Sequence, residues 1–561
     1  MPLLRLLLVC AALLLLVLTK PEYYMDTVVY VNEIILASKQ DFAPGRNPLW
    51  EFGHILWRPL GSWGWLAIDS LPFLRERFNE TQRAYLPFVA MNIVSGILGI
   101  ALMYVIARRF VGDTWRAYVA TFGLLTSHSY LAYWQTGSAY NPGITSLLAS
   151  IYFADQARRS HKWIVPSAAA GFFLALAVLL WLPYVFAAPA IVLFVMLPFP
   201  DANEPRPAWR ERLNPALLLT LVTLLIGVAG YAWAAKANHI TSVSEFMDWA
   251  GRSSHGVAQT KRLLRLPTAL PRSVVHVGED GMMLKRFVLK DPYAPVSITG
   301  LLRLSVVKMI AFYGALVLLL YALSRTRRGR WTLAFLCLTA GINILFAVVL
   351  FEPSGVERYM PSFPFLWLAV AMALETGPPV EWILCGAVGL MAINNAHALS
   401  PLVHGSQDSA TFARRALVRD LPAGSQIVLV NFKDELWRQQ FRLPFHPEMK
   451  TTLPVYDVLE TGTAQAAETW RSNWAAKCLR AFEERGEVWM SERLFQDRPL
   501  PDWKWVEGDQ PGVTWPAFPR FFRSYEYGER RGGEDGFRRL LPSPSNLEKL
   551  KTLLAAAPKA H

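Results

Sequence analysis

The apolar residues of this chain gather into long runs that charged or proline-rich segments separate. The runs are about 15 to 23 residues long, close to the length that an α-helix needs to cross a hydrocarbon core of about 30 Å. The pattern predicts a polytopic α-helical membrane protein with about 11 spans. These lie at residues 3–19, 85–107, 117–134, 138–154, 164–182, 184–198, 215–235, 304–323, 331–350, 361–375 and 379–397.

Composition agrees with this pattern. Of the 561 residues, 53% are hydrophobic, and the mean hydropathy is +0.25, which is too apolar for a soluble multidomain protein. The net charge of +13 favours contact with anionic lipid or a phosphate-bearing substrate. No block of Lys and Arg has the density of a nucleic-acid-binding arm, so no nucleic-acid partner is expected. The four cysteines have no spacing typical of a metal site or a disulfide framework.

Short basic loops set the expected orientation. Arg and Lys gather in every second short loop, near residues 108–116, 158–162, 206–212 and 325–330. The excess of positive charge in cytoplasmic loops predicts that these four face the cytoplasm. The first apolar run lacks a small-residue cleavage site before the polar region, which favours an uncleaved signal anchor. We therefore expect a multi-pass protein of the plasma or inner membrane, with its C-terminal part extracytoplasmic.

The C-terminal part has a different pattern. Residues 1–400 hold all the spans, and residues 401–561 are polar and predict an extracytoplasmic α/β domain. Within that domain the sequence predicts strands at 424–431 and 487–491, an amphipathic helix at 466–485 and a short helix at 546–554. No glycine-rich phosphate-binding fingerprint occurs, so a nucleotide site is not expected.

Two acids follow the first apolar run. Asp26 lies just past it on the predicted outer side. An ionisable residue at the membrane edge costs free energy unless it is solvated or paired, which makes Asp26 a candidate functional residue. An ordinary interfacial acid or a helix cap explains Asp26 equally well. Glu33 lies on the same face if this segment is helical, where a solvated helix face is the favoured interpretation.

The same predicted loop contains His54 and Arg58. A guanidinium binds phosphate through two parallel hydrogen bonds, so Arg58 is a candidate phosphate ligand. His54 could donate to a substrate oxygen or bind a metal, although a lone histidine is more often a structural hydrogen-bond partner. Farther on, residues 136–143 are small and end in Asn-Pro-Gly. They predict a turn that starts a helix, or else a helix N-terminus facing an anion; the turn is favoured.

Late in the chain, Glu357, Arg358 and Tyr359 sit between two apolar runs. An arginine and a tyrosine here would grip a phosphate; alternatively, Glu357 and Arg358 form a local pair that fixes the loop. The segment 236–303 carries ten Lys and Arg against five Asp and Glu. This excess fits either a basic surface on anionic headgroups or a specific phosphate site.

In these features the chain resembles the GT-C superfamily of polytopic membrane glycosyltransferases, which includes mannosyl- and arabinosyltransferase-like enzymes that use polyprenyl-phosphate sugars. Three elements carry the resemblance over residues 1–400: Asp26 after the first span, the Gly-His…Arg-Pro-Leu stretch at 53–60, and the Glu-Arg-Tyr…Pro…Pro element at 357–364. The resemblance implies an inverting transfer in which Asp26 takes a proton from the acceptor hydroxyl. Members often carry further acids in the second outer loop, whereas residues 129–141 contain none, so a divalent metal stays an open question.

The leading hypothesis is therefore a membrane glycosyltransferase that moves a sugar from a polyprenyl-phosphate donor to an extracytoplasmic acceptor of the cell envelope. Asp26 and Glu33 are the candidate catalytic acids, Asp26 being preferred as the base. Arg58 and Arg358 would hold the phosphate, and basic residues of 261–290 would guide the lipid headgroup. Two alternatives remain: a transporter or flippase of lipid-linked sugars, and a non-catalytic membrane scaffold.

Overall fold

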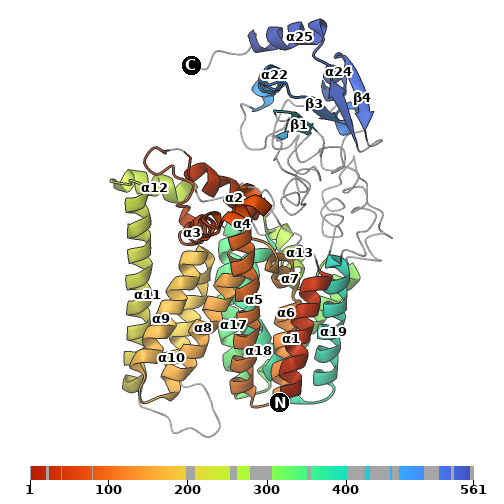
Figure 1. The fold of residues 1–561 in the computed structure, drawn as a ribbon. Coiled ribbons are helices and arrows are strands. Elements are labelled where there is room, and N and C mark those ends of the chain that lie inside the picture. Colours follow the sequence, from red (N-terminus) through yellow and green to blue (C-terminus); the bar gives the residue numbers. More distant parts are fainter. Residues whose placement is uncertain are drawn as a thin grey trace. The chain divides into compact units, whose positions relative to one another are not determined.

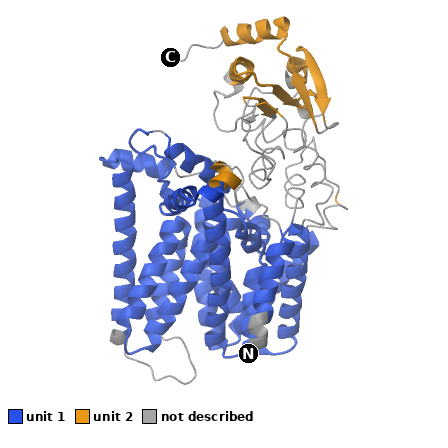
Figure 2. Cartoon of the chain, viewed as in Figure 1, with its two compact units in different colours: residues 1–74, 83–283, 299–403 blue, residues 75–82, 284–298, 404–561 orange. Residues whose placement is uncertain are grey.

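The computed structural model shows a helical bundle and a small sheet-containing unit (Figure 1). It divides into two compact units (Figure 2), residues 1–74, 83–283 and 299–403, and residues 75–82, 284–298 and 404–561. The residues that the structure describes are 2–19, 25–39, 41–78, 80–196, 209–252, 262–277, 298, 306–349, 355–400, 421–422, 424–429, 455–457, 466–497, 517–531 and 536–555.

The first unit is built of helices that run side by side, and the shorter helices α2, α3 and α12 lie at one end of the bundle (Figure 1). The bundle helices are α1 (Pro2–Leu18), α5 (Glu80–Val111), α6 (Thr114–Thr126), α7 (His128–Trp134), α8 (Tyr140–Arg159), α9 (Ile164–Leu180), α10 (Ala188–Met196), α11 (Trp209–Ala237), α16 (Val307–Ser324), α17 (Arg327–Val349), α18 (Phe363–Ala373) and α19 (Val380–Leu399). The shorter elements are α2 (Met25–Ala37), η1 (Phe52–His54), α3 (Trp57–Asp69), α4 (Pro72–Arg77), η2 (Leu182–Ala187), α12 (Val243–Arg252), α13 (Arg262–Val274), η4 (Val356–Ser362) and η5 (Leu374–Thr376).

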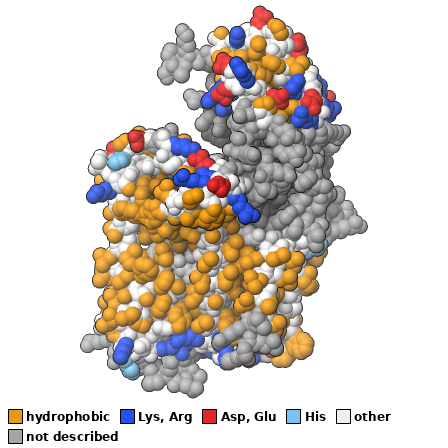
Figure 3. Space-filling model, viewed as in Figure 1, with side chains coloured by type: hydrophobic (Ala, Val, Ile, Leu, Met, Phe, Trp, Pro, Cys, Tyr) orange, Lys and Arg blue, Asp and Glu red, His pale blue; other side chains and the backbone are white. Residues whose placement is uncertain are grey.

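The bundle belongs to an integral, multi-pass membrane protein. Within the described residues, five helices are long and apolar enough to cross a membrane: α5, α11, α16, α17 and α19. Exposed leucine and valine side chains such as Leu221 and Val228 lie on α11, and apolar side chains cover the flank of the bundle (Figure 3). Lipid is the solvent that such a surface fits. The predicted number of 11 spans is not confirmed.

Two of the predicted spans differ from the structure. The run 117–134 forms two helices, because Ser127 adopts extended angles, φ −59° and ψ 135°. Its neighbour Ser129 uses its hydroxyl to donate to the carbonyl oxygens of Ser273 and Val356, at 2.7 and 3.2 Å. The run 361–375 contains α18, whose 11 residues extend only about 16 Å at 1.5 Å per residue. A serine hydroxyl thus binds the backbone of two other segments at the break between α6 and α7.

Glycine allows close packing of the bundle. A Cβ atom on Gly123 of α6 would lie 2.2 Å from the Trp367 ring of α18, and one on Gly96 of α5 would lie 2.0 Å from Trp134. Small residues at such contacts let membrane helices approach closely. The contact between Gly96 and Trp134 packs α7 closely against α5. The turn to α8 follows directly after Trp134.

The second unit contains a five-stranded sheet of order β2-β1-β3-β5-β4. Its elements are β1 (Gln426–Leu429), β2 (Val455–Asp457), α22 (Ala466–Glu483), β3 (Val488–Ser491), η7 (Glu492–Phe495), α24 (Ala517–Phe522), β4 (Tyr527–Arg531), β5 (Phe537–Leu540) and α25 (Pro544–Ala555). β1 pairs in parallel with β2 and β3, and β5 pairs antiparallel with β3 and β4. Trp474 and Cys478 of α22 are buried in one core with Val488 and Met490 of β3.

The predicted α/β class of the C-terminal part is confirmed. The two predicted strands and two predicted helices correspond to β1, β3, α22 and α25, within a few residues at each end. The pattern did not predict β2, β4 and β5, which are short, and β4 has mostly exposed side chains. The proposed domain boundary between residues 400 and 401 stays a prediction.

Candidate active site

Asp26 forms the first part of the site. It lies in the first turn of α2, where the partial positive charge of a helix N-terminus stabilises a carboxylate. The Tyr140 hydroxyl donates to Asp26 Oδ2 over 2.6 Å. Tyr140 is buried and Asp26 is only partly buried. Tyr140 therefore orients a carboxylate whose residue keeps some exposure.

The turn between α7 and α8 places Tyr140. The Asn92 side-chain amide of α5 lies 3.1, 2.9 and 2.8 Å from the carbonyl oxygens of Tyr133, Thr136 and Ser138. These contacts close the turn around one buried donor group. The predicted turn thus occupies residues 135–139, and α8 already begins at Tyr140, so that residues 140–143 form its first turn.

The same turn is also fixed to the elements that carry the first-loop candidates. The Thr27 hydroxyl of α2 accepts from the Gly137 amide at 2.8 Å. The Trp57 indole of α3 donates to the Gly137 carbonyl at 2.7 Å. Thr27 is the neighbour of Asp26 and Trp57 is the neighbour of Arg58. The turn therefore sets the register between Asp26 and Tyr140.

Glu357 of η4 is the second carboxylate of the site. The Tyr133 hydroxyl donates to Glu357 Oε2 at 2.9 Å, and Arg358 Nε lies 3.3 Å from Glu357 Oε1. Burial raises the pKa of the Glu357 carboxyl; the Arg358 charge opposes this shift, and the Asp26 charge adds to it. Asp26 and Glu357 are brought near each other through Tyr140 and Tyr133, which donate to one carboxylate each and pack ring against ring.

Aromatic rings connect the two carboxylates. The Tyr133 and Tyr140 rings meet edge to face with centroids 4.6 Å apart. Tyr140 contacts Trp181 in the same manner at 4.7 Å. The Arg358 guanidinium lies 5.8 Å from the Trp181 ring centroid. Asp26, Glu357 and Arg358 are thus arranged around three packed rings, an arrangement that combines charge with flat apolar faces.

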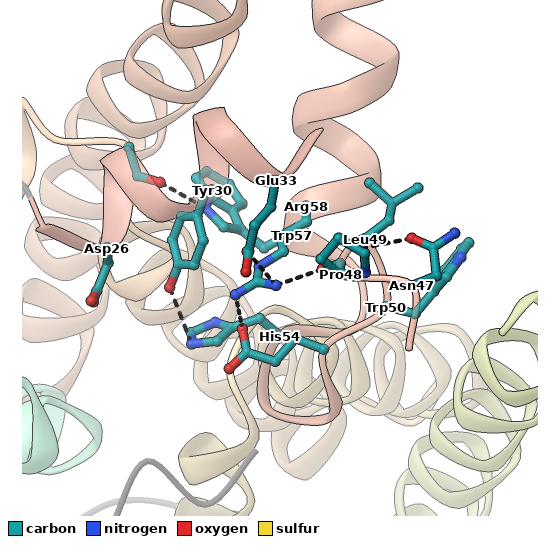
Figure 4. A network of polar contacts seen from close by, with 12 residues as sticks. Asp26, Tyr30, Glu33, Asn47, Pro48, Leu49, Trp50, His54, Trp57 and Arg58 are labelled. Carbon is teal, nitrogen blue, oxygen red and sulfur yellow. Dashed lines mark hydrogen bonds and ion pairs between the residues drawn. The ribbon is translucent and has the colours of Figure 1, made fainter. Parts of the chain in front are cut away.

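His54 is held by protein groups on both ring nitrogens. Nδ1 lies 3.1 Å from the Leu180 carbonyl oxygen. Nε2 lies 3.3 Å from the Tyr30 hydroxyl (Figure 4). A carbonyl only accepts, so we assign the proton to Nδ1, and Nε2 accepts from Tyr30. Burial lowers the pKa of His54, which keeps the ring neutral. In this structure His54 orients Tyr30, and its binding to substrate stays a prediction.

Arg58 lies at the centre of a second network (Figure 4). Its guanidinium contacts Glu33 at 2.6 Å, Glu51 at 2.5 Å and the Pro48 carbonyl at 2.5 Å. The side chain is 5% exposed, and Cζ lies 4.9 Å from the Tyr30 ring centroid. These contacts hold the loop before α3 against α2. The phosphate role of Arg58 remains a prediction.

Glu33 departs from the sequence-based interpretation. A solvated helix face was expected, and the structure instead pairs Glu33 with the buried Arg58. The physical reason is that Arg58 is buried with Glu51, so the ion pairs replace the water that the guanidinium loses. Glu51 was not singled out in the sequence, because only the fold brings it to Arg58.

The structure brings some predicted site residues together and separates others. Asp26, Glu357 and Arg358 lie around Tyr133 and Tyr140, whereas Glu33 and Arg58 form the neighbouring network that Tyr30 and His54 border. Tyr359 is buried, and burial together with the Glu357 charge raises the pKa of its hydroxyl. The tyrosines of residues 133 and 140 were missed; the small-residue turn that lies between them in the sequence was their one signal.

Two further predictions concern a bound metal ion and the basic residues that would contact the lipid headgroup. Among the described residues, no group of three or more His, Cys, Asp or Glu side chains is placed to hold a metal ion. The divalent metal raised by the GT-C resemblance stays a prediction. Six of the basic residues predicted to guide the lipid have side chains that the structure does not describe: Lys261, Arg262, Arg265, Lys285, Arg286 and Lys290. Among the predicted residues of this segment, the side chain of Arg272 is described.

Solved structures share this architecture. The apo structure of ArnT from Cupriavidus metallidurans matches with a TM-score of 0.52 and 13% identity, over 97% of this chain and 98% of that chain. The chain has the GT-C fold. ArnT bound to undecaprenyl phosphate also matches, with a TM-score of 0.50 and 13% identity, over 96% of this chain and 98% of that chain.

The GT-C fold predicted from the three sequence elements is thus confirmed, and the likeness spans both the bundle and the C-terminal unit. Neither the protein-family models nor the curated proteins give a match to the sequence.

Proposed function

We propose that the chain is a membrane glycosyltransferase that moves a sugar from a polyprenyl-phosphate donor to a hydroxyl-bearing acceptor, with inversion at the anomeric carbon. The observation that carries the proposal is the site itself: a partly exposed Asp26, oriented by Tyr140, beside the Glu357–Arg358 pair. The GT-C fold over nearly the whole chain supports it. Membrane glycosyl transfer needs these groups close together in one site.

Asp26 acts as the general base. The acceptor hydroxyl gives its proton to the carboxylate while its oxygen forms a bond to the anomeric carbon. The bond from that carbon to the phosphate oxygen breaks on the opposite face, and the lipid phosphate leaves with the electron pair. Tyr140 keeps one carboxylate oxygen in place through its hydrogen bond. A positioned general base contributes about 10²–10⁴-fold in rate.

Arg358 binds the leaving phosphate. Its guanidinium lies beside Glu357 and near the Trp181 ring. A bidentate guanidinium stabilises the negative charge that grows on the phosphate as the bond breaks. Glu357 in turn holds Arg358 in place.

The proposed sugar donor is a lipid-linked one, because the protein is a membrane protein with the same fold as ArnT. ArnT has been seen bound to undecaprenyl phosphate, and a lipid-phosphate-linked sugar is the donor that we propose here. We place the site and the 401–561 domain on the extracytoplasmic side, because basic loops gather at the other ends of the helices, near Arg109, Arg158 and Arg328.

An in-vitro transfer assay tests the proposal. The purified full chain in lipid nanodiscs is given a panel of radiolabelled polyprenyl-phosphate sugars and an extract of envelope lipids and glycans as acceptors. We expect a covalent product whose new glycosidic bond has the anomeric configuration opposite to that of the donor, measured by NMR. Protein-dependent transbilayer movement of the donor without a covalent product would favour the flippase alternative. Absence of both activities over the panel would favour the scaffold.

A further inference from the structure

Helix α12 carries exposed apolar side chains on one flank. Val243 is 80% exposed and Met247 is 64% exposed. With Phe246 and Ala250 they form the i, i+3, i+4, i+7 stripe of an amphipathic helix. Trp249 is buried, and Asp248 and Arg252 lie on the opposite, polar flank. A short helix that exposes apolar groups beside its buried face is costly to hold in water.

The position of α12 in the bundle indicates that its apolar flank lies at the level of the membrane surface. α12 lies across the C-terminal end of α11 (Figure 1), and α11 exposes a stripe of leucine and valine up to Val228. Trp233 near the end of α11 is 43% exposed, and Trp63 of α3 is 48% exposed; their rings are 6.0 Å apart. Exposed tryptophans at the end of a lipid-facing helix mark the headgroup level of a bilayer.

The helix is rigidly formed and anchored. Glu245 Oε2 accepts from the amides of Thr241 and Ser242 at 2.7 and 3.1 Å, and the Glu245 amide lies 3.2 Å from the Ser242 hydroxyl. This is a capping box, which stabilises a helix start. The Trp249 indole donates to the Trp50 carbonyl at 2.7 Å, so the helix is held in place from its buried face.

Further contacts tie α12 to the loop that carries the site residues. Arg252 Nη1 donates to the Gly45 carbonyl at 3.0 Å. Asn238, just before the helix, accepts through its backbone oxygen from Gly45 at 2.7 Å and through its side-chain oxygen from Asn47 at 3.0 Å. The loop continues through Trp50 into η1 and α3. The position of α12 is therefore coupled to the position of the segment that holds His54 and Arg58.

We propose that α12 is an in-plane interfacial helix, which inserts Val243 and Met247 into the boundary between lipid headgroups and acyl chains at this end of the bundle. Its partner is the bilayer surface itself. Amphipathic helices bind there by burying their apolar flank while the polar flank stays in water. The helix fixes the loop 41–54 at the level of the membrane surface. This inference concerns an interaction surface and does not depend on the transfer reaction.

Depth measurements by spin labelling test the inference. In a background with all four native cysteines replaced, the full chain receives one cysteine at Val243, Met247 or Asp248. Each variant is reconstituted into vesicles that contain phosphatidylcholine and phosphatidylglycerol. Accessibility to oxygen, which partitions into lipid, is compared with accessibility to a nickel chelate, which stays in water. Asp248 is the matched control, because it lies on the polar flank of the same helix.

We expect the labels at Val243 and Met247 to favour oxygen and the label at Asp248 to favour the nickel chelate, so that the sign of the logarithmic ratio inverts within one helix. Two exposed positions are tested, so that the inference can still be tested at one of them if the variant at the other folds poorly. The elution profile identifies a poorly folding variant. Equal nickel accessibility at all three sites would overturn the inference. Dipolar broadening between labels at Val243 would also overturn it, because a second copy of the chain would then cover this flank.

Discussion

At the scale of single residues, the site separates two kinds of charged group. The carboxylates of Asp26 and Glu357 each accept from one tyrosine hydroxyl, while Arg58 engages two carboxylates and a carbonyl. A buried arginine that satisfies protein acceptors stabilises a loop; removing it leaves charges unpaired. Arg358, which pairs with its own neighbour Glu357, is the better candidate for an incoming phosphate.

Arg358 should therefore be required for donor use. We expect Arg358→Ala to lose about 2 to 4 kcal/mol of transition-state binding for the lipid donor, because a desolvated charge pair is lost. Arg358→Lys should retain more activity, since it keeps the charge and loses only the bidentate geometry. Steady-state kinetics over donor concentration measure both variants.

The control for Arg358 is Arg480→Ala, which removes an exposed arginine from α22 and should leave donor kinetics unchanged. Normal donor kinetics in Arg358→Ala, together with a lowered melting temperature, would mean that Arg358 only fixes the loop of η4.

His54 should make stability fall as the pH falls. Burial lowers the pKa of His54 in the folded chain below its unfolded value of about 6.5. Below about pH 6.5 the unfolded chain thus binds more protons, so unfolding becomes easier as pH falls towards the folded pKa. Comparing pH 8 with pH 5.5, the melting temperature in detergent should fall more for wild type than for His54→Gln, which has no titrating ring. An equal fall in both would show that His54 is not held neutral.

At the scale of elements, the turn between α7 and α8 decides where the tyrosines point. Sequence patterns located the turn from its small residues and its Asn-Pro-Gly. They did not reveal that Asn92 of α5 closes it, or that Tyr133 and Tyr140 reach η4 and α2. Those contacts join segments that are far apart in the chain, and hydrophobic periodicity carries no information about them.

Asn92 should be important for stability. Asn92→Ala leaves three buried carbonyl contacts unmade, and each unsatisfied buried group costs about 1–3 kcal/mol. We expect a loss of about 2 kcal/mol or more, seen as a lower melting temperature in detergent. The matched control is Asn32→Ala on α2, an exposed position where the change should stay within about 0.5 kcal/mol. Equal melting temperatures for the two variants would show that the turn does not depend on Asn92.

At the scale of the whole molecule, hydropathy predicted the helical bundle and the α/β class of the C-terminal part. It did less well on helix ends, because Ser127 leaves helical backbone angles and Ser129 donates to backbone carbonyls of other segments, so the apolar run is broken there. Asp26, Glu357 and Arg358 were identified as candidates by their position next to apolar runs. Glu51 and the tyrosines emerged only from the three-dimensional fold.

The predicted topology places the C-terminal unit outside the cytoplasm. A single cysteine at Lys551, exposed on α25, should react with a membrane-impermeant maleimide in right-side-out vesicles. A cysteine at Lys162, in a short basic loop, should react only after the membrane is permeabilised, because positive loops stay in the cytoplasm. The opposite labelling pattern would place the site on the cytoplasmic side.

The central proposal is that Asp26 is the base of a glycosyl transfer, and the turnover of Asp26→Asn tests it most directly. Asparagine keeps the shape of the side chain and the contact with Tyr140, and removes the proton acceptor. With a donor that the wild type uses, we expect Asp26→Asn to lose about 10²–10⁴-fold in rate while eluting and melting as wild type does. Glu381→Gln, at an acid in the first turn of α19, should keep full activity. Full turnover by Asp26→Asn, with Glu33→Gln inactive but folded, would contradict the assignment and move the base to Glu33.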